Sequence, residues 1–270
     1  MGRTALSLCS MALGLARPAI AAVGDEEPDA APHAEPTAMV VQPCGAPAEG
    51  DWALAERILH NDWAWLCRYA EENRAVLAAG SPQAVFIGDS ITEGWLHADP
   101  GFFAHGNLDR GIGGQTSPQL LVRFWQDVVA LRPAVVHIMV GTNDLAGNTG
   151  LTSALAWRSN IRAMVAIARA NGIAVVLGSI PPADRFGWRP GLAPARQIVA
   201  LNGWLKSYAE ESGLAYADYH SALADAGGGL PPALSDDGVH LNPAGYALMR
   251  PIAERALAAA MRQQGQAGDR

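Results

Sequence analysis

The sequence predicts an α/β fold in which helices cover both faces of a parallel β-sheet. Short, mostly apolar segments alternate with longer segments whose apolar residues recur at helical spacing. The run at 134–140 is almost continuously apolar, which is typical of a strand buried on both faces. The alternation occupies 49–262, a length that suits one domain with a single core.

The first half of this region contains two predicted helices and three predicted strands. Helical spacing predicts a helix within 51–79, and the apolar run at 84–87 predicts a short buried strand. A weaker strand pattern at 107–112 precedes a helical pattern at 117–131, which leads into the strand at 134–140.

The second half continues the alternation and closes with a helix. Asn242 is the predicted N-cap of that last helix, and Pro243 suits its first turn. The elements before it, in the order helix, strand, helix, strand, are expected at 151–171, 173–180, 194–212 and 214–219. Right-handed crossovers between such elements place the carboxyl ends of all strands at one edge of the sheet.

Residues suited to acyl transfer are expected at this edge. Ser90, Gly114 and Asn143 each follow a different predicted strand, so the fold should bring them together. A serine hydroxyl needs a neighbouring base to become a nucleophile, and His240 is the candidate. Asp237, three residues earlier, can hold the imidazole in the required tautomer.

The same edge offers donors for the negative charge that develops on a carbonyl oxygen. The N–H of Ser90 can serve if Ser90 opens a helix, and glycine at 114 lets the backbone approach a ligand closely. Asn143 can add a side-chain amide. These residues together predict a nucleophile, a base, an orienting carboxylate and an oxyanion hole.

Substrate contacts are expected from residues beside these groups. Asp89, Trp95 and Asp144 are the main candidates, although Trp95 could equally pack its helix onto the sheet. The Pro-rich loop after the strand at 173–180 supplies further candidates, namely Asp184, Arg185, Trp188 and Arg189.

Several other classes of ligand are not expected. No histidine or cysteine pair has zinc-site spacing, so neither a metal nor another cofactor is predicted. The pair Gly113-Gly114 lacks the following Gly-Lys-Ser/Thr of a phosphate-binding loop. The net charge of −7 disfavours nucleic acid as a partner.

Four sequence blocks resemble those of the SGNH/GDSL hydrolase superfamily, and they span 85–246. The stretch from Arg110 to Thr116 is most similar to the branch of platelet-activating-factor acetylhydrolase-like and carbohydrate esterase-like members. One departure is Ile91, where the family's name-giving block has leucine. The blocks are Gly88-Asp89-Ser90-Ile91, Gly113-Gly114, Gly141-Thr142-Asn143-Asp144 and Asp237-Gly238-Val239-His240.

The resemblance implies a fold and a set of roles. The fold would be a flavodoxin-like three-layer α/β/α sandwich with a five-stranded parallel sheet. Ser90 would be the nucleophile and first oxyanion donor, Gly114 and Asn143 the other donors, His240 the base and Asp237 its orienter. The expected substrate is a small-molecule or carbohydrate ester.

The leading functional hypothesis is therefore an exported serine esterase that removes short acyl groups, above all acetyl groups. Three alternatives stay open: a lysophospholipase-like or thioesterase-like hydrolase, a glycan O-acyltransferase, and a non-catalytic glycan-binding protein on the same scaffold. An intact nucleophile, base and carboxylate argue against the last of these, since a binding protein needs no nucleophile.

The ends of the chain carry their own predictions. Residues 1–21 are typical of a secretory signal with cleavage near Ala21, because Arg3 precedes an apolar run too short to span a bilayer. A periplasmic or secreted protein without a stable membrane anchor is expected. Residues 22–48 are rich in Ala, Pro and Glu, which predicts a flexible linker, and 263–270 form an expected disordered tail.

Two cysteines would remain after removal of the signal. Cys44 and Cys67 could form a disulfide in an oxidising compartment or stay as two thiols. The oligomeric state is left open by the sequence.

Overall fold

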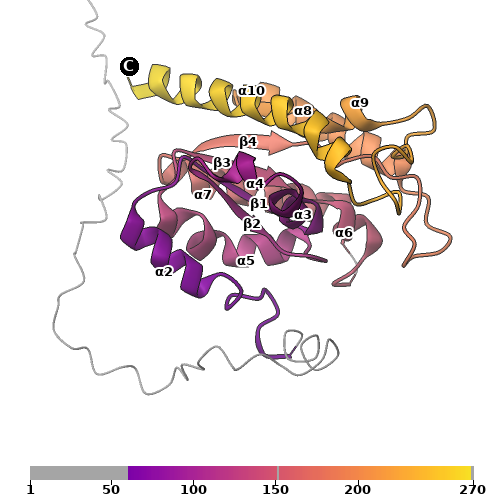
Figure 1. Cartoon of the computed structure of the whole chain (residues 1–270), viewed down its shortest axis with the longest axis horizontal. Coiled ribbons are helices and arrows are strands. Elements are labelled where there is room, and N and C mark those ends of the chain that lie inside the picture. Colours follow the sequence, from indigo (N-terminus) through magenta and orange to yellow (C-terminus); the bar gives the residue numbers. More distant parts are fainter. Residues whose placement is uncertain (1–59, 151, 269–270) are drawn as a thin grey trace, which may run out of the picture. The chain divides into compact units, whose positions relative to one another are not determined.

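A five-stranded parallel sheet in the order β2-β1-β3-β4-β5 forms the centre of the protein (Figure 1). The computed structural model describes residues 60–150 and 152–268. The predicted α/β fold with a parallel five-stranded sheet is confirmed. The strands are β1 Ala84–Gly88, β2 Asn107–Gly111, β3 Val135–Met139, β4 Ala174–Gly178 and β5 Ala215–Ala217.

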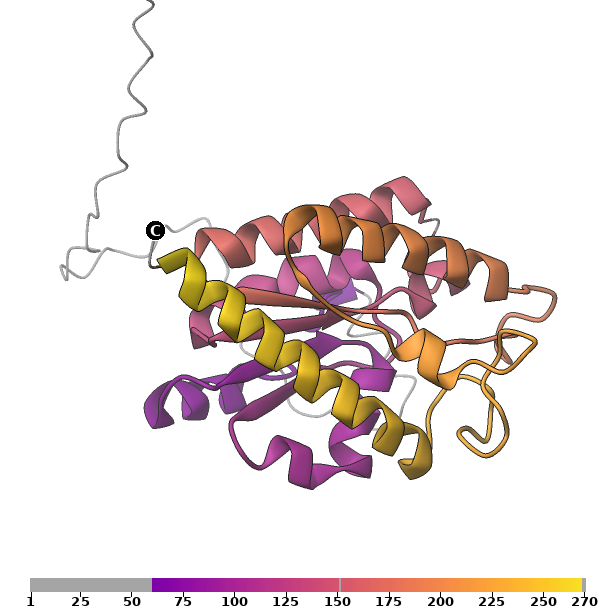
Figure 2. The ribbon, with the colours of Figure 1, turned by 90° about the horizontal axis from the view of Figure 1, so that it is seen from above.

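Helices cover both faces of this sheet. One layer packs α5, α7 and α8 against it, and the other packs α3, α4, α9 and α10 (Figures 1 and 2). The helices are α2 Ala70–Ala79, α3 Ser90–Ala98, α4 Pro100–Phe103, α5 Ser117–Asp127, α6 Thr142–Ala146, α7 Ala154–Ala170, α8 Ala195–Ser212, α9 Tyr219–Leu223 and α10 Pro243–Gly268, with a 3₁₀ turn at Val129–Leu131.

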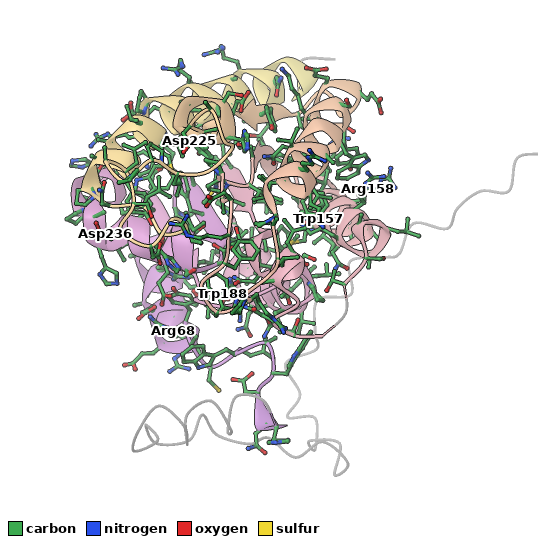
Figure 3. All side chains as sticks on the ribbon, turned by 90° about the vertical axis from the view of Figure 1, so that its right-hand side faces the viewer. Arg68, Trp157, Arg158, Trp188, Asp225 and Asp236 are labelled. Carbon is green, nitrogen blue, oxygen red and sulfur yellow. The ribbon has the colours of Figure 1, made fainter. Side chains whose placement is uncertain are left out.

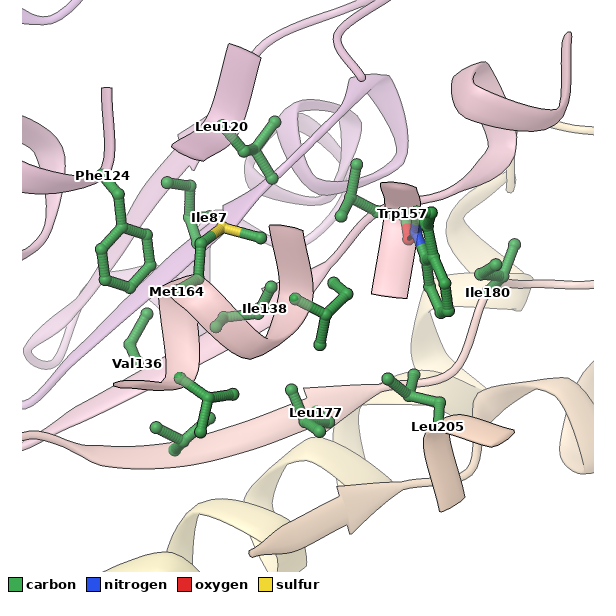
Figure 4. Packing of buried hydrophobic residues seen from close by; sticks show 14 of the residues in the cluster. Ile87, Leu120, Phe124, Val136, Ile138, Trp157, Met164, Leu177, Ile180 and Leu205 are labelled. Carbon is green, nitrogen blue, oxygen red and sulfur yellow. Dashed lines mark hydrogen bonds between the residues drawn. The ribbon is translucent and has the colours of Figure 1, made fainter. Parts of the chain in front are cut away.

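The period-two geometry of the strands divides the core between these layers. Val85 and Ile87 of β1 face α5 and α7, where Figure 4 shows Ile87 among Phe124 and Met164. Phe86 points to the opposite layer. Each fully buried side chain of this size stabilises the fold by about 1.5–3 kcal/mol relative to an exposed one. Because both faces are covered, β1, β3 and β4 are nearly continuous apolar runs, whereas the edge strand β2 contains Asp109 and Arg110.

The prediction of a helix within 51–79 is wrong over part of this range. Among the described residues of this range, His60 and Asn61 and then Ala70–Ala79 are helical, with turns between them, and 51–59 lie outside the described residues. The Asp62 side chain accepts hydrogen bonds from the N–H groups of Leu66 and Cys67, at 2.7 and 2.9 Å. These bonds favour a turn over a helix, and Trp65 completes it with a φ of 54°.

Other element boundaries also differ from the prediction. The helix expected at 117–131 breaks at Val128, which leaves the α conformation with a φ of −130°. The last helix continues to Gly268, into the tail at 263–270 that was expected to be disordered. The short helices α4, α6 and α9 were not predicted.

Several predictions concern residues outside the described part. The signal, the linker and Cys44 all lie there. Cys67 itself is disulfide-bonded. Among residues 60–150 and 152–268, no helix combines the length and the apolar character that a bilayer span requires.

Candidate active site

The turn after β1 places Ser90 at the carboxyl edge of the sheet. A side chain at Gly88 would clash, because a Cβ there would lie 2.0 Å from Thr92 Oγ1 and 2.7 Å from the Met139 carbonyl oxygen. Asp89 then caps α3, its carboxylate accepting a hydrogen bond from the Ile91 N–H at 3.0 Å. Ser90 is thus the first residue of α3, and its N–H has no acceptor within the helix.

The loop before α10 brings an imidazole and a carboxylate to this serine. The Ser90 Oγ and His240 Nε2 atoms lie 2.9 Å apart, and His240 Nδ1 lies 2.7 Å from Asp237 Oδ2. An ionised carboxylate can only accept, so Nδ1 carries the proton and Nε2 faces the hydroxyl as an acceptor. The structure therefore assembles the three residues that the sequence predicted, although 150 positions separate Ser90 from His240.

Local hydrogen bonds hold Asp237 in place. Its Oδ1 atom accepts hydrogen bonds from the backbone N–H groups of Val239 and His240, at 2.8 and 2.7 Å. Burial alone would raise the pKa of Asp237, but the hydrogen bonds from the His240 side chain and from these N–H groups outweigh it and lower the pKa to about 2. Asp237 therefore stays ionised at any pH near neutrality.

The other two predicted oxyanion donors are Gly114, in the loop between β2 and α5, and Asn143, in α6. Gly114 has a φ of +77°, which favours glycine, and no atom lies within 4 Å of where its Cβ would be. Its backbone is consequently open to a ligand. Asn143 lies on α6, where its Nδ2 atom donates to the Gln115 carbonyl oxygen at 3.1 Å. The second N–H of that amide remains for another acceptor.

A salt bridge between Glu93 of α3 and Arg68, in the turn before α2, lies beside the loop that carries Gly113 and Gly114. The Glu93 carboxylate accepts a hydrogen bond from the Gly113 N–H at 2.8 Å and faces Arg68 at 3.6 Å. Glu93 lies one turn after Ser90 on α3. The loop that carries Gly114 is thus tied to the same helix that carries the serine.

A buried polar network, missed by sequence reasoning, lies beneath the site. The fully buried Arg123 donates to the Gly88 carbonyl oxygen at 3.0 Å and to Gln115 Oε1 at 2.6 Å. It also pairs with Asp127 at 3.1 Å, and Asp127 accepts from Asn73 at 2.7 Å. Burial lowers the pKa of Arg123, and the carboxylate of Asp127 opposes that effect.

The only sequence signal for this network is the position of Arg123. It stands directly before Phe124 and three residues after Leu120, on the apolar side of α5. A charged residue at such a position is a candidate for a buried pair.

The three main candidates for substrate contact, Asp89, Trp95 and Asp144, lie inside the protein instead. Trp95 is fully buried and stacks against Phe102 and Tyr246, with ring centroids 5.1 and 5.7 Å away. Asp89 is used as the helix cap. Asp144 accepts hydrogen bonds from the hydroxyl and the N–H of Ser117, at 2.5 and 3.1 Å. The expectation of direct substrate contact therefore does not fit these positions, because each side chain is buried and already partnered.

Burial also changes the acidity of both carboxyl groups. It raises the pKa of Asp89 to about 7, against the opposing effects of the Ile91 N–H and of His240. It likewise raises the pKa of Asp144, although the hydrogen bonds from Ser117 lower it. Within the part of the chain that the structure describes, no three histidine, cysteine or acidic side chains gather where they could hold a metal ion.

A three-layer α/β/α fold with these sequence blocks at its carboxyl edge defines the class as the SGNH/GDSL hydrolase superfamily. Comparison with family models gives a match over residues 86–248 to the GDSL-like lipase/acylhydrolase family. The chain belongs to that family.

Two solved structures from Bacteroides species are similar over most of the domain. An acylhydrolase-like protein from Bacteroides fragilis is 41% identical with a TM-score of 0.71, and the match covers 75% of this chain and 100% of that one. A GDSL-like lipase from Bacteroides thetaiotaomicron is 38% identical with a TM-score of 0.69, over 74% of this chain and 100% of that one. No curated protein matches the chain significantly.

A more distant structure shares the fold. An acetyl-xylooligosaccharide esterase from Geobacillus is 23% identical with a TM-score of 0.51, and the match covers 66% of this chain and 95% of that one.

Proposed function

We propose that this protein is a serine esterase that hydrolyses short-chain acyl esters, with acetyl esters of carbohydrates as the leading substrate class. The observation that carries the proposal is the continuous arrangement of Ser90 Oγ, His240 and Asp237, with contacts of 2.9 and 2.7 Å. A hydroxyl, an imidazole and a carboxylate in this order are the requirements for a serine nucleophile.

The first half of the reaction forms an acyl-enzyme. Ser90 Oγ attacks the ester carbonyl carbon while its proton passes to His240 Nε2, and the carbonyl oxygen becomes an oxyanion. The N–H groups of Ser90 and Gly114 and the Asn143 amide donate to that oxygen. Asp237 stabilises the imidazolium. Collapse of the intermediate breaks the bond to the alcohol oxygen, which leaves with the proton from His240.

The second half restores the free serine. His240 removes a proton from a water molecule, whose oxygen attacks the acyl carbon, and the same donors stabilise the second oxyanion. Collapse of this intermediate returns the proton to Ser90 Oγ and releases the carboxylic acid. No group other than the side chains and backbone named here is needed for the protons to balance.

Exposure at the site supports a small acyl group on a bulky alcohol. The side chains of His240 and Asp237 are 45% and 52% exposed, and the space beside Gly114 is open. An ester that is carried on a sugar can reach such a site from solvent. The similarity to an acetyl-xylooligosaccharide esterase adds support at the level of the fold.

Hydrolysis of 4-nitrophenyl acetate tests the proposed function. The wild-type protein should release nitrophenolate, and Ser90→Ala should abolish this activity with an unchanged circular dichroism spectrum. Full activity in Ser90→Ala would eliminate the site. A panel of 4-nitrophenyl esters from acetyl to palmitoyl, with acetylated xylooligosaccharides, then separates a short-chain esterase from a lysophospholipase-like or thioesterase-like enzyme.

Acyl transfer and export are tested separately. Added free oligosaccharide should leave acetate as the main product, whereas an acetylated acceptor would identify an O-acyltransferase. Export through residues 1–21 is also part of the proposal. Fractionation should recover the mature chain from the periplasm or medium, starting near residue 22, and an uncut chain in the cytoplasm would contradict it.

A further inference from the structure

The side-chain amide of Asn143 is held at both ends by hydrogen bonds. Its Nδ2 atom donates to the Gln115 carbonyl oxygen at 3.1 Å, and its Oδ1 atom accepts from Asn148 Nδ2 at 2.7 Å. The Asn148 Oδ1 atom in turn accepts from the indole N–H of Trp188 at 3.0 Å. A relay of four residues therefore runs from the Pro-rich loop to the candidate oxyanion hole.

The chemistry of the two ends fixes the direction of every amide in this relay. An indole N–H can only donate, so Asn148 must turn its oxygen to Trp188 and its nitrogen to Asn143. A backbone carbonyl can only accept, so Asn143 must turn its nitrogen to Gln115. In the flipped orientation, Asn143 would set two oxygens against each other at Gln115 and two N–H₂ groups against each other at Asn148.

The loop that carries Asn148 is itself fixed from several sides. The Asn148 N–H donates to the Asn143 carbonyl oxygen at 3.1 Å, after Gly147 turns the chain with a φ of +68°. The Arg189 side chain donates to the Gly147 carbonyl oxygen at 2.9 Å. The hydroxyl groups of Thr116 and Thr149 lie 2.7 Å apart. The relay therefore has a defined geometry, although Asn148 is exposed.

Trp188 occupies the outer end of the relay. Its indole is 42% exposed and stacks on Phe186, with ring centroids 5.0 Å apart. Figure 3 views the side of the molecule at which the strands end and labels Trp188 there, on the same side as Asp236, the neighbour of Asp237. The Pro-rich loop thus reaches the active edge from the surface.

From these contacts we infer that Trp188 and Asn148 are positioning residues, which orient the Asn143 amide so that its free N–H points to the oxyanion. This inference rests on the proposed esterase function. Asn143 would act on the transition state, where the oxygen carries charge, and much less on the bound ester. Loss of the relay should therefore lower kcat and leave KM unchanged.

Substitutions at Asn148 test the relay with 4-nitrophenyl acetate as the substrate. Asn148→Asp keeps the acceptor for Trp188 but puts a carboxylate against Asn143 Oδ1, so that kcat should fall by about 10²-fold, as on loss of one oxyanion donor. Asn148→Ala and Trp188→Phe should produce smaller losses in the same parameter. Because Asn148 is exposed, the melting temperature of its variants should match that of the wild type.

A double-mutant cycle separates the relay from a direct effect of charge. In an Asn143→Ala background, Asn148→Asp should cause no further loss, because the amide on which Asn148 acts is gone. An equal loss in both backgrounds would overturn the inference, as would an unchanged kcat in Asn148→Asp. The matched control is Trp125→Phe, which removes an indole that is 62% exposed on α5 and should retain wild-type kcat.

Failure of the inference is distinguishable from failure of the proposed function. If wild type and Ser90→Ala are equally inactive on every ester, the esterase proposal fails. If wild type is active and Asn148→Asp is equally active, the esterase proposal stands and only the relay is rejected.

Discussion

The two halves of the candidate site are built in different ways. The acid–base half, Asp237 and His240, is about half exposed and is fixed by hydrogen bonds within residues 235–240. The oxyanion half rests on the fully buried Arg123, which connects Gln115 to Gly88, 35 positions before it in the chain. Catalytic groups can thus be oriented by a local turn or by the core, and only orientation by the core should couple activity to stability.

The largest expected effect is on the exposed half. Asp237→Asn should lower kcat by about 10⁴-fold, because an amide cannot hold the imidazole in the required tautomer. The melting temperature should barely change, since Asp237 is 52% exposed. Kinetics with 4-nitrophenyl acetate and calorimetry on the same sample check both statements. A large drop in melting temperature would show that this half is also part of the stabilising core.

The second-largest expected effect is a loss of stability when the buried half of the site is changed. Arg123→Met leaves Asp127 buried without its partner, which should lower the free energy of unfolding by about 3–5 kcal/mol. Urea denaturation measures this change. The matched control is Arg250→Met, which breaks the surface ion pairs with Glu254 and Asp99. It should leave the free energy of unfolding nearly unchanged.

A double variant sharpens the same measurement. Replacing both members of the buried pair, as in Arg123→Met with Asp127→Leu, should recover much of the lost stability, because no unpaired charge remains. If the double variant is less stable than Arg123→Met alone, the hydrogen bond that Asp127 accepts from Asn73 contributes more to stability than the ion pair does.

The smallest expected effect concerns pH, and two carboxyl groups, the buried Asp109 of β2 and the exposed Asp237, should respond in opposite directions. Burial raises the pKa of Asp109 to about 7, against the opposing hydrogen bond from the Gly111 N–H. The folded state then binds the proton more tightly than the unfolded state, so stability should fall as the pH rises from about 4 to about 7. Asp237, whose pKa is lowered, should instead lose its contribution only as the pH falls toward about 2.

Thermal unfolding at pH 5 and pH 8 checks this prediction. Asp109→Asn cannot ionise, so it should be stabilised relative to wild type more at pH 8 than at pH 5. An identical difference at both values would mean that Asp109 is already neutral, or already charged, throughout this range.

The sequence was sufficient for the sheet and for the residues that meet at its edge. Strands buried on both faces appear as apolar runs, such as the one that became β3, and parallel topology then places their carboxyl ends together. The residues that the structure puts on this edge include Ser90, Asn143 and His240, which sequence spacing had already singled out.

The same reasoning failed where proximity in sequence was taken for proximity to substrate. Trp95 follows Ser90 by five positions, but α3 turns it inward to the core. Arg123 and Asn148 were not predicted because their roles depend on partners at Gly88 and Trp188, 35 and 40 positions away. Long-range pairing of polar side chains leaves no periodic pattern that a single sequence could show.

The position of His240 just before the C-terminal helix has a consequence for synthesis of the chain. A ribosome completes the nucleophile, the glycine loop and Asn143 well before it reaches the base, and α10 must then pack onto the sheet to close the loop that holds His240. A growing polypeptide that has not reached His240 therefore carries a serine without its base, and hydrolysis becomes possible only once His240 and α10 have been made.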